Sequence, residues 1–171
     1  NISIKEYAPY TKEKVSSIIN DVSEEYQRWK LLNFSDRKNV LINIAQSLEG
    51  NVQEHAEMIT NEIGKPIVES RMEVLKCAWT IRYFADNSEE FLKKEYIKTD
   101  YKESYIQYDP LGVILGIMPW NFPYWQVFRF AAPLLMAGNV CVIKHASNVS
   151  GCSLLIEQVI LENSPLKNIY A

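Results

Sequence analysis

The chain has 171 residues, 18 of them basic and 21 acidic, and it is 47% hydrophobic with only 6 glycines and 7 prolines. These proportions exclude a disordered or collagen-like protein and leave enough apolar material for a core. A net charge of −3 without any Lys/Arg-rich run argues against nucleic acid as the main partner.

Helical periodicity dominates the first half of the chain. Apolar residues recur at helical spacing over 15–29 and again over 41–52, after a possible cap at Ser35. This second helix is predicted to end at Gly64, with Pro66 suited to opening a third. The third helix places Val74, Ala78, Ile81 and Ala85 on one face, which we interpret as core packing.

From Tyr96 onward the pattern changes to strands. Tyrosine and isoleucine alternate with polar residues around Thr99-Asp100, which predicts a β-hairpin. Two apolar runs follow, at 112–118 and 140–143, each leading into a helical segment, the first from about Phe122 to Ala137 and the second from Cys152 to Glu162. The order strand, helix, strand, helix predicts an α/β fold with buried parallel strands.

Open α/β sheets bind ligands at the carboxyl ends of their strands, here Met118–Pro123 and Lys144–Ser150. Asn121 stands where the helix would begin, so its amide either serves a developing oxyanion or caps the helix. With a helix from Phe122, Asn121, Trp125 and Arg129 would share one side. A guanidinium in such an apolar helix needs an anion, either a protein carboxylate or a ligand.

Other signatures of a reaction are missing. The turn after the second strand offers no acidic residue for a ribose, and neither GxGxxG nor GxxxxGK occurs. His55 and His145 stand alone, so we expect no metal site. Three scattered cysteines without a CxxC pair favour a reducing compartment, and the apolar runs are too short to span a membrane, so we expect a cytoplasmic protein.

A set of motifs in fixed order resembles the aldehyde dehydrogenase superfamily. They are Glu62–Pro66, Pro110–Val113, Pro119–Pro123, Ala132-Pro133, Ala137–Asn139 and Val142–Lys144. Within the superfamily the resemblance is closest to bacterial succinate-semialdehyde dehydrogenases, on Trp125–Val127, Arg129, Lys144–Ala146, Asn148-Val149 and Gly151-Cys152. Members are roughly three times as long, so the resemblance covers an amino-terminal portion only.

The resemblance implies a domain plan. Residues 1–95 would form a helical segment packed on the nucleotide domain, and residues 96–109 a hairpin through which subunits form a homo-oligomer. Residues 110–171 would be the first βαβα part of a Rossmann-like NAD(P)-binding domain.

The resemblance also assigns the site. Asn121 would be the catalytic residue, supplying half of the oxyanion hole, whereas the nucleophilic cysteine and the general-base glutamate belong to sequence absent here. Cys77, Cys141 and Cys152 do not match the nucleophile's motif and are assigned to packing. The aldehyde would be bound by Phe122, Trp125, Gln126 and Arg129, and the cofactor by Ile117, Met118, Pro119, Trp120, Lys144, Ala146 and Ser147.

The implied activity is oxidation of an aldehyde, with succinate semialdehyde favoured as substrate and NAD or NADP as cofactor. Because the family's proline and glutamate after the lysine are replaced by His145 and Ser147, we expect NADP to be accepted alongside NAD. One alternative is a general aliphatic aldehyde dehydrogenase, and another is a truncated, non-catalytic fragment that acts as a binding or dimerisation module. The 171-residue chain alone is expected to be inactive.

Overall fold

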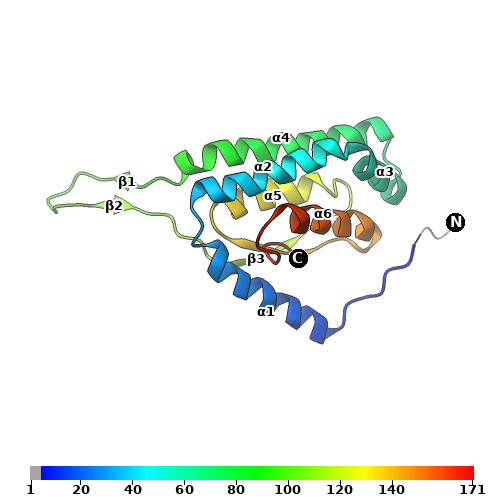
Figure 1. The fold of residues 1–171 in the computed structure, drawn as a ribbon, viewed down its shortest axis with the longest axis horizontal. Coiled ribbons are helices and arrows are strands. Elements are labelled where there is room, and N and C mark those ends of the chain that lie inside the picture. The colour runs from blue at the N-terminus through cyan, green and yellow to red at the C-terminus, as the bar shows by residue number, and fades with distance from the viewer. Residues whose placement is uncertain (1–4) are drawn as a thin grey trace.

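The computed structural model describes residues 5–171 as a mixed α/β structure that is mostly helical (Figure 1). Four helices come first, then a hairpin, then two strands that alternate with helices. Their bounds are α1 Lys12–Trp29, α2 Phe34–Gly50, α3 Val52–Ile63, α4 Ile67–Phe91, β1 Glu95–Tyr96, β2 Tyr105–Ile106, β3 Val113–Ile117, α5 Trp125–Met136, β4 Val140–Lys144, the short 3₁₀ helix η1 Ser147–Val149 and α6 Ser150–Asn163.

Helix α1 matches the predicted amphipathic segment. Its cap is Thr11, whose hydroxyl accepts a hydrogen bond from the Lys14 N–H at 3.2 Å. Val22 and Trp29 are fully buried, and the Trp29 indole N–H donates to the Leu135 carbonyl at 3.1 Å. That bond ties the end of α1 to the end of α5.

The prediction of one helix from Ser35 to Gly64 was wrong, because the segment forms two helices, α2 and α3. The break falls at Asn51, where the backbone leaves the helical region and the side chain donates to the Ser47 carbonyl. The cap of α2 is Asn33 instead of Ser35, and its side chain accepts from the Asp36 N–H at 2.8 Å.

The end of the predicted helix is confirmed. Gly64 adopts the left-handed conformation, φ 72°, at the end of α3, and Pro66 directly precedes α4. The four residues assigned to the core face of the third helix, Val74, Ala78, Ile81 and Ala85, are all buried.

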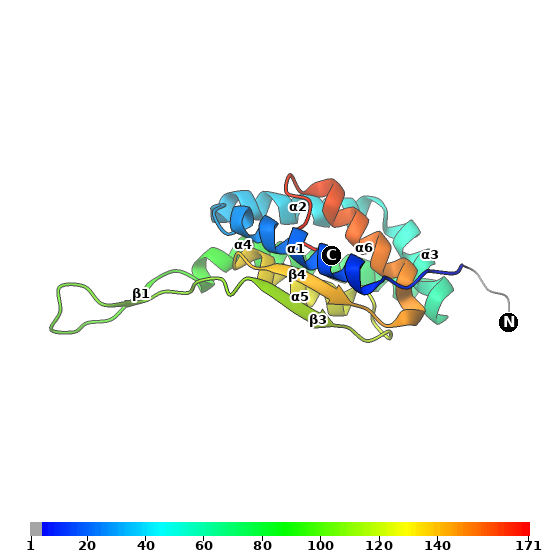
Figure 2. The same cartoon turned by 90° about the horizontal axis from the view of Figure 1, so that it is seen from below.

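The hairpin is confirmed as two very short antiparallel strands, with Glu95 opposite Ile106 and Tyr96 opposite Tyr105. It extends from the body of the molecule as a long arm, visible from two directions (Figures 1 and 2). Its tyrosines and isoleucines are exposed, so this arm presents apolar surface that the described residues leave uncovered.

The strand, helix, strand order is also confirmed, but the burial predicted for both strands holds only in part. Val140 and Cys141 of β4 are buried, whereas Leu115 and Ile117 of β3 are exposed. Strands β3 and β4 pair in parallel, from Val113 opposite Val140 to Ile117 opposite Lys144, and α5 connects them. The Asn139 side chain fixes the start of the unit by accepting the Leu111 and Gly112 N–H groups at 2.7 and 3.1 Å. At the other edge of β4, Tyr170 makes a parallel bridge with Cys141, so the sheet continues toward the chain end.

The helices cover the strands in layers. Helix α5 packs on β4, α4 packs on α5, and α2 packs on α4. Helix α1 contacts both strands and lies apart from α2 and α4, below the strands in the view of Figure 1. Within residues 5–171, no helix combines the length and the apolar character that a membrane crossing requires.

Candidate active site

The two strand ends that the sequence singled out lie side by side. Ile117 and Lys144 are register partners at the ends of β3 and β4, and the Met118 N–H donates to the Lys144 carbonyl at 3.0 Å. Ile117, Pro119 and Trp120 are exposed, whereas Met118 is buried. Residues predicted to bind the cofactor therefore lie together at the carboxyl ends of both strands.

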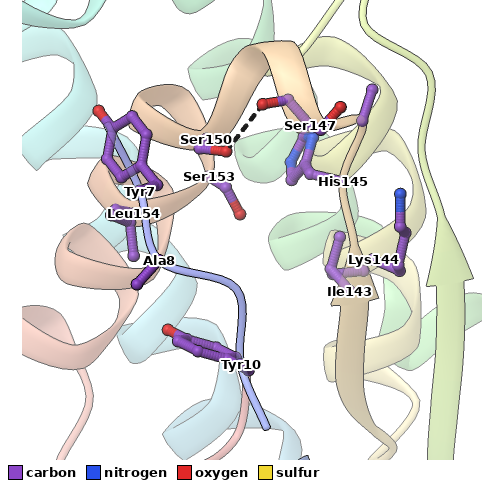
Figure 3. A pocket seen from close by; sticks show the side chains of 11 residues that line it. Tyr7, Ala8, Tyr10, Ile143, Lys144, His145, Ser147, Ser150, Ser153 and Leu154 are labelled. Carbon is purple, nitrogen blue, oxygen red and sulfur yellow. Dashed lines mark hydrogen bonds between the residues drawn. The ribbon is translucent and has the colours of Figure 1, made fainter. Parts of the chain in front are cut away.

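A hollow of about 450 Å³ opens beyond the end of β4 (Figure 3). Figure 3 shows it bordered on one side by Ile143, Lys144, His145 and Ser147 and on the other by Tyr7, Ala8 and Leu154. Tyr10, Ala146, Ser150 and Ser153 complete the lining. None of these side chains is acidic and one is a lysine, so the hollow suits a polar, anionic ligand.

His145 is the unusual residue of this hollow. It is buried, and neither ring nitrogen has a hydrogen-bond partner among the described residues. Burial, together with the Lys144 charge, lowers the pKa of His145 to about 4, so the ring is neutral at physiological pH. Among residues 5–171 no His, Cys, Asp and Glu side chains cluster as metal ligands would.

The turn that carries Asn121 differs from the prediction. Helix α5 begins at Trp125, three residues later than expected, with Tyr124 at its N-cap, so the alternative that Asn121 caps the helix does not hold. Asn121 precedes the helix and therefore does not share a helical face with Trp125 and Arg129. Its side chain is exposed and makes no hydrogen bond to any described residue.

Helix α5 begins late because its first amides are capped from another helix. The buried Glu73 carboxylate of α4 accepts the Tyr124 and Trp125 N–H groups, each at 3.0 Å. A carboxylate at this end of a helix satisfies the unpaired amides and complements the helix dipole. The Asn121 amide is thereby left available for a ligand.

A second hollow, of about 540 Å³, lies between α4 and this turn. It is lined by Glu69, Met72, Glu73 and Lys76 of α4 and by Asn121, Phe122, Trp125 and Gln126. The Lys76 ammonium lies 4.2 Å from the centroid of the Trp125 ring. Aromatic and apolar walls with a few polar groups are typical of a small-molecule site.

Arg129 is one turn further along α5 and does not line this hollow. It is exposed, so the cost of burying its charge, on which the need for an anion was based, does not arise. Its guanidinium lies 6.0 Å from the Trp125 ring centroid, and no acidic residue of the described chain forms an ion pair with it. The described structure thus contains no carboxylate partner for Arg129.

Comparison with known proteins now identifies the family. The model of the aldehyde dehydrogenase family matches residues 2–166. The chain belongs to the aldehyde dehydrogenase family. It is 45% identical over 157 residues to a probable succinate-semialdehyde dehydrogenase [NADP(+)] of Synechocystis, covering 92% of this chain and 35% of that protein. A succinate semialdehyde dehydrogenase [NAD(P)+] of Escherichia coli K12 is 41% identical over 145 residues, 85% of this chain and 31% of that one.

Solved structures of other aldehyde dehydrogenases share the fold. The succinic semialdehyde dehydrogenase of Streptococcus pyogenes, solved in complex with NADP+, superposes with a TM-score of 0.93 at 30% identity, over 98% of this chain and 37% of that one. The chain thus spans about a third of the length of the relatives it matches.

None of the cysteines in this aldehyde dehydrogenase chain faces either hollow. Cys77, Cys141 and Cys152 are fully buried, as expected for packing residues. Burial raises the pKa of Cys141 to about 12 and also raises the pKa values of the other two. Because a nucleophilic cysteine needs an accessible thiolate, these three are unsuited to that role.

Sequence reasoning missed the residues that line the hollows from other helices. Lys76 and Met72 come from α4, and Tyr7 and Tyr10 from the segment before α1. Only Glu73 could have been recognised from the sequence, because helical spacing places it on the buried face of its helix. An acid in that position requires a specific partner. The others are ordinary helix or loop residues whose place in the site depends on packing between distant segments.

Proposed function

We propose that this chain is the amino-terminal part of an NAD(P)-dependent enzyme that oxidises succinate semialdehyde to succinate. The observation that carries the proposal is the Asn121 turn. It presents an amide without a partner among the described residues, four positions after the end of β3 and on the wall of the 540 Å³ hollow. The names of the similar proteins support the choice of substrate.

Asn121 is proposed to stabilise negative charge on the reacting carbonyl oxygen. Its side-chain N–H groups have no partner among the described residues, and Glu73 fixes the backbone three and four positions further along the chain. In the family the attacking cysteine and the general-base glutamate lie in sequence that this chain does not contain. Phe122, Trp125 and Gln126 would hold the aldehyde against the donor.

The residues at the end of β4 fit a dinucleotide. The hollow there is lined by Lys144 and by no acidic side chain. Lys144, Ala146 and Ser147 are proposed to hold the adenosine ribose, with Ile117–Trp120 against the rest of the cofactor. When bound, NAD(P) accepts the hydride of the substrate. Without an acid at Ser147 nothing repels a 2′-phosphate, so we expect NADP to be used alongside NAD.

Arg129 is proposed to select for the second carboxylate of the substrate. It has no acidic partner in the described chain and lies over the Trp125 ring, beside a wall of the aldehyde hollow. A charge-assisted contact of this kind would favour succinate semialdehyde over an uncharged aldehyde of equal length.

The proposal includes the domain plan. Residues 110–171 would begin a Rossmann-like nucleotide domain, residues 1–95 would pack on it, and the exposed hairpin at 96–109 would join subunits.

A fusion protein tests this function. Residues 1–171 replace the corresponding first third of the Synechocystis relative, and the fusion is assayed with succinate semialdehyde and with butyraldehyde, using NADP+ and NAD+. We expect oxidation with both cofactors and a higher kcat/KM for succinate semialdehyde. Equal kcat/KM for the two aldehydes would favour a general aliphatic aldehyde dehydrogenase. A well-folded fusion that oxidises neither would contradict the proposal.

A non-catalytic role remains as the second candidate for the isolated chain, because its three thiols are buried and protonated. The purified 171-residue chain should therefore reduce no cofactor in the presence of aldehyde. Cofactor reduction above the blank that a thiol reagent abolishes would contradict this expectation.

A further inference from the structure

The junction between α3 and α4 lies against both turns of the proposed site. It comprises Glu62 in the last turn of α3, Lys65 in the linker and Glu73 in the second turn of α4. These three side chains reach residues about 50 to 90 positions further along the chain. Their contacts separate into two groups, one for each turn.

Glu73 and Lys65 hold the turn of Asn121. One carboxylate oxygen of Glu73 accepts the Tyr124 and Trp125 N–H groups, each at 3.0 Å, and the other accepts the Lys65 ammonium. The Lys65 ammonium also lies 3.9 Å from the centroid of the Phe122 ring. The ion pair is nearly dry, with 10% of the Lys65 and 3% of the Glu73 side chain exposed.

Glu62 holds the turn that follows Lys144. Its two carboxylate oxygens accept the Gly151 N–H at 2.7 Å and the Cys152 N–H at 2.9 Å, which are first-turn amides of α6. A side chain at position 151 would collide with this carboxylate, since an added Cβ would lie 2.8 Å from the Glu62 oxygen. Glycine therefore permits the close approach of the carboxylate.

Neither helix supplies its own cap. Tyr124 and Val149 occupy the N-cap positions of α5 and α6, and neither makes a side-chain capping bond. The start of each helix is thus fixed mainly by an acid from the α3–α4 region, and charge-assisted bonds of this kind are stronger than neutral ones.

We infer that Glu73 and Glu62 are positioning residues, Glu73 for the Asn121 amide and Glu62 for the cofactor turn at Lys144–Ser147. The inference rests on the proposed function for the roles of the two turns. Because the two carboxylates contact different helices, each controls one turn independently of the other. Glu73 acts together with Lys65, whose ammonium donates to the carboxylate oxygen that the α5 amides do not use.

Amide hydrogen exchange in the 171-residue chain tests the contacts directly. Glu73→Gln should lower the protection of the Tyr124 and Trp125 amides about tenfold or more and leave Gly151 and Cys152 within about twofold. Glu62→Gln should show the reverse pattern. Glu90→Gln, which removes an acid from an exposed ion pair on α4, is the control and should change neither pair of amides.

Kinetics of the fusion protein test the consequence for the site. Glu73→Gln should lower kcat about tenfold or more with the KM for NADP+ nearly unchanged, because only the oxyanion donor is displaced. Glu62→Gln should raise the KM for NADP+ and leave kcat nearly unchanged. This split between kcat and KM separates positioning from a general loss of folded protein.

Should Glu73→Gln fail to fold, Glu73→Asp keeps the charge beside Lys65 but draws the carboxylate back from α5, and it should reproduce the loss at Tyr124 and Trp125. The inference is supported if each variant lowers amide protection only at the helix start that its carboxylate contacts. It is overturned if either variant lowers the protection equally at both turns. An inactive parent fusion would contradict the proposed function, while the exchange pattern would still support or overturn the positioning of the turns.

Discussion

Removing the Lys65 ammonium should destabilise the chain far more than removing an exposed lysine. Lys65→Met keeps most of the apolar stem and deletes the charge, so Glu73 is left as a buried carboxylate with a 3% exposed side chain. Breaking a buried ion pair in this way typically costs about 3 to 5 kcal/mol. Because two amides still donate to Glu73, we expect a loss of unfolding free energy near the lower end of this range, about 3 kcal/mol.

The matched control is Lys93→Met. Lys93 pairs with Glu90 at the end of α4, but 60% and 70% of these side chains are exposed, so the expected cost is at most about 1 kcal/mol. Urea unfolding of the 171-residue chain, followed by tryptophan fluorescence, measures both. We take an m-value, the change of unfolding free energy with urea concentration, of about 2 kcal/mol per M. Lys65→Met should then lower the urea midpoint of unfolding by about 1.5 M, and Lys93→Met should lower it by less than about 0.5 M.

A double variant tests the mechanism of the loss. In the double variant Lys65→Met/Glu73→Gln, no unpaired charge remains buried. Its loss of unfolding free energy should therefore be smaller than the sum of the losses in the two single variants. The reasoning is refuted if Lys65→Met and Lys93→Met shift the midpoint equally, because Glu73 would then not depend on its partner.

The remaining predictions concern reactivity and selectivity. Because burial keeps the thiols protonated, Ellman's reagent should label almost none of Cys77, Cys141 and Cys152 in the folded chain and all three in urea, and rapid labelling without denaturant would contradict their burial. In the fusion protein, Arg129→Leu should lower kcat/KM for succinate semialdehyde about tenfold to a hundredfold while sparing butyraldehyde, and equal losses would deny Arg129 contact with the substrate carboxylate. Ser147→Glu should weaken NADP+ binding far more than NAD+ binding in a fluorescence titration, and equal effects would show that this position does not face the 2′-phosphate. The isolated chain, with its exposed hairpin, should also self-associate on size-exclusion chromatography, and a monomer at high concentration would argue against that.

The sequence predicted the elements whose signals are local. Periodicity located α1 and the core face of α4, and a glycine followed by a proline located the junction at Gly64–Pro66. The two apolar runs predicted the parallel strand pair, whose register brings Ile117 and Lys144 together. In each case a few neighbouring residues decide the conformation.

The errors arose where tertiary contacts decide. Asn51 ends one helix and begins the next, although apolar spacing continues through it. The start of α5 depends on Glu73, which is 51 residues from the amide it caps at Tyr124, and no local pattern at residues 119–125 contains that information. Arg129 was expected to need an anion because its neighbours in the helix are apolar, but α5 turns it to solvent.

The candidate site was predictable only where local signals or the family resemblance located its residues. The strand ends were located from the pattern of strands and helices, and the residue roles came from the resemblance to the family. The walls contributed by α4 and by the segment before α1 were not predictable, since Lys76 and Tyr7 reach the hollows only through packing of distant segments.

The kcat of Asn121→Ala in the fusion protein, with succinate semialdehyde and NADP+ at saturation, tests the central claim most directly. If Asn121 donates to the oxyanion, its removal should lower kcat about 10²- to 10³-fold and leave the KM for NADP+ nearly unchanged. Asn121 makes no hydrogen bond within the described chain, so folding should be unaffected, which circular dichroism verifies. A fall in kcat of less than about threefold would contradict the assignment of this turn as the active site.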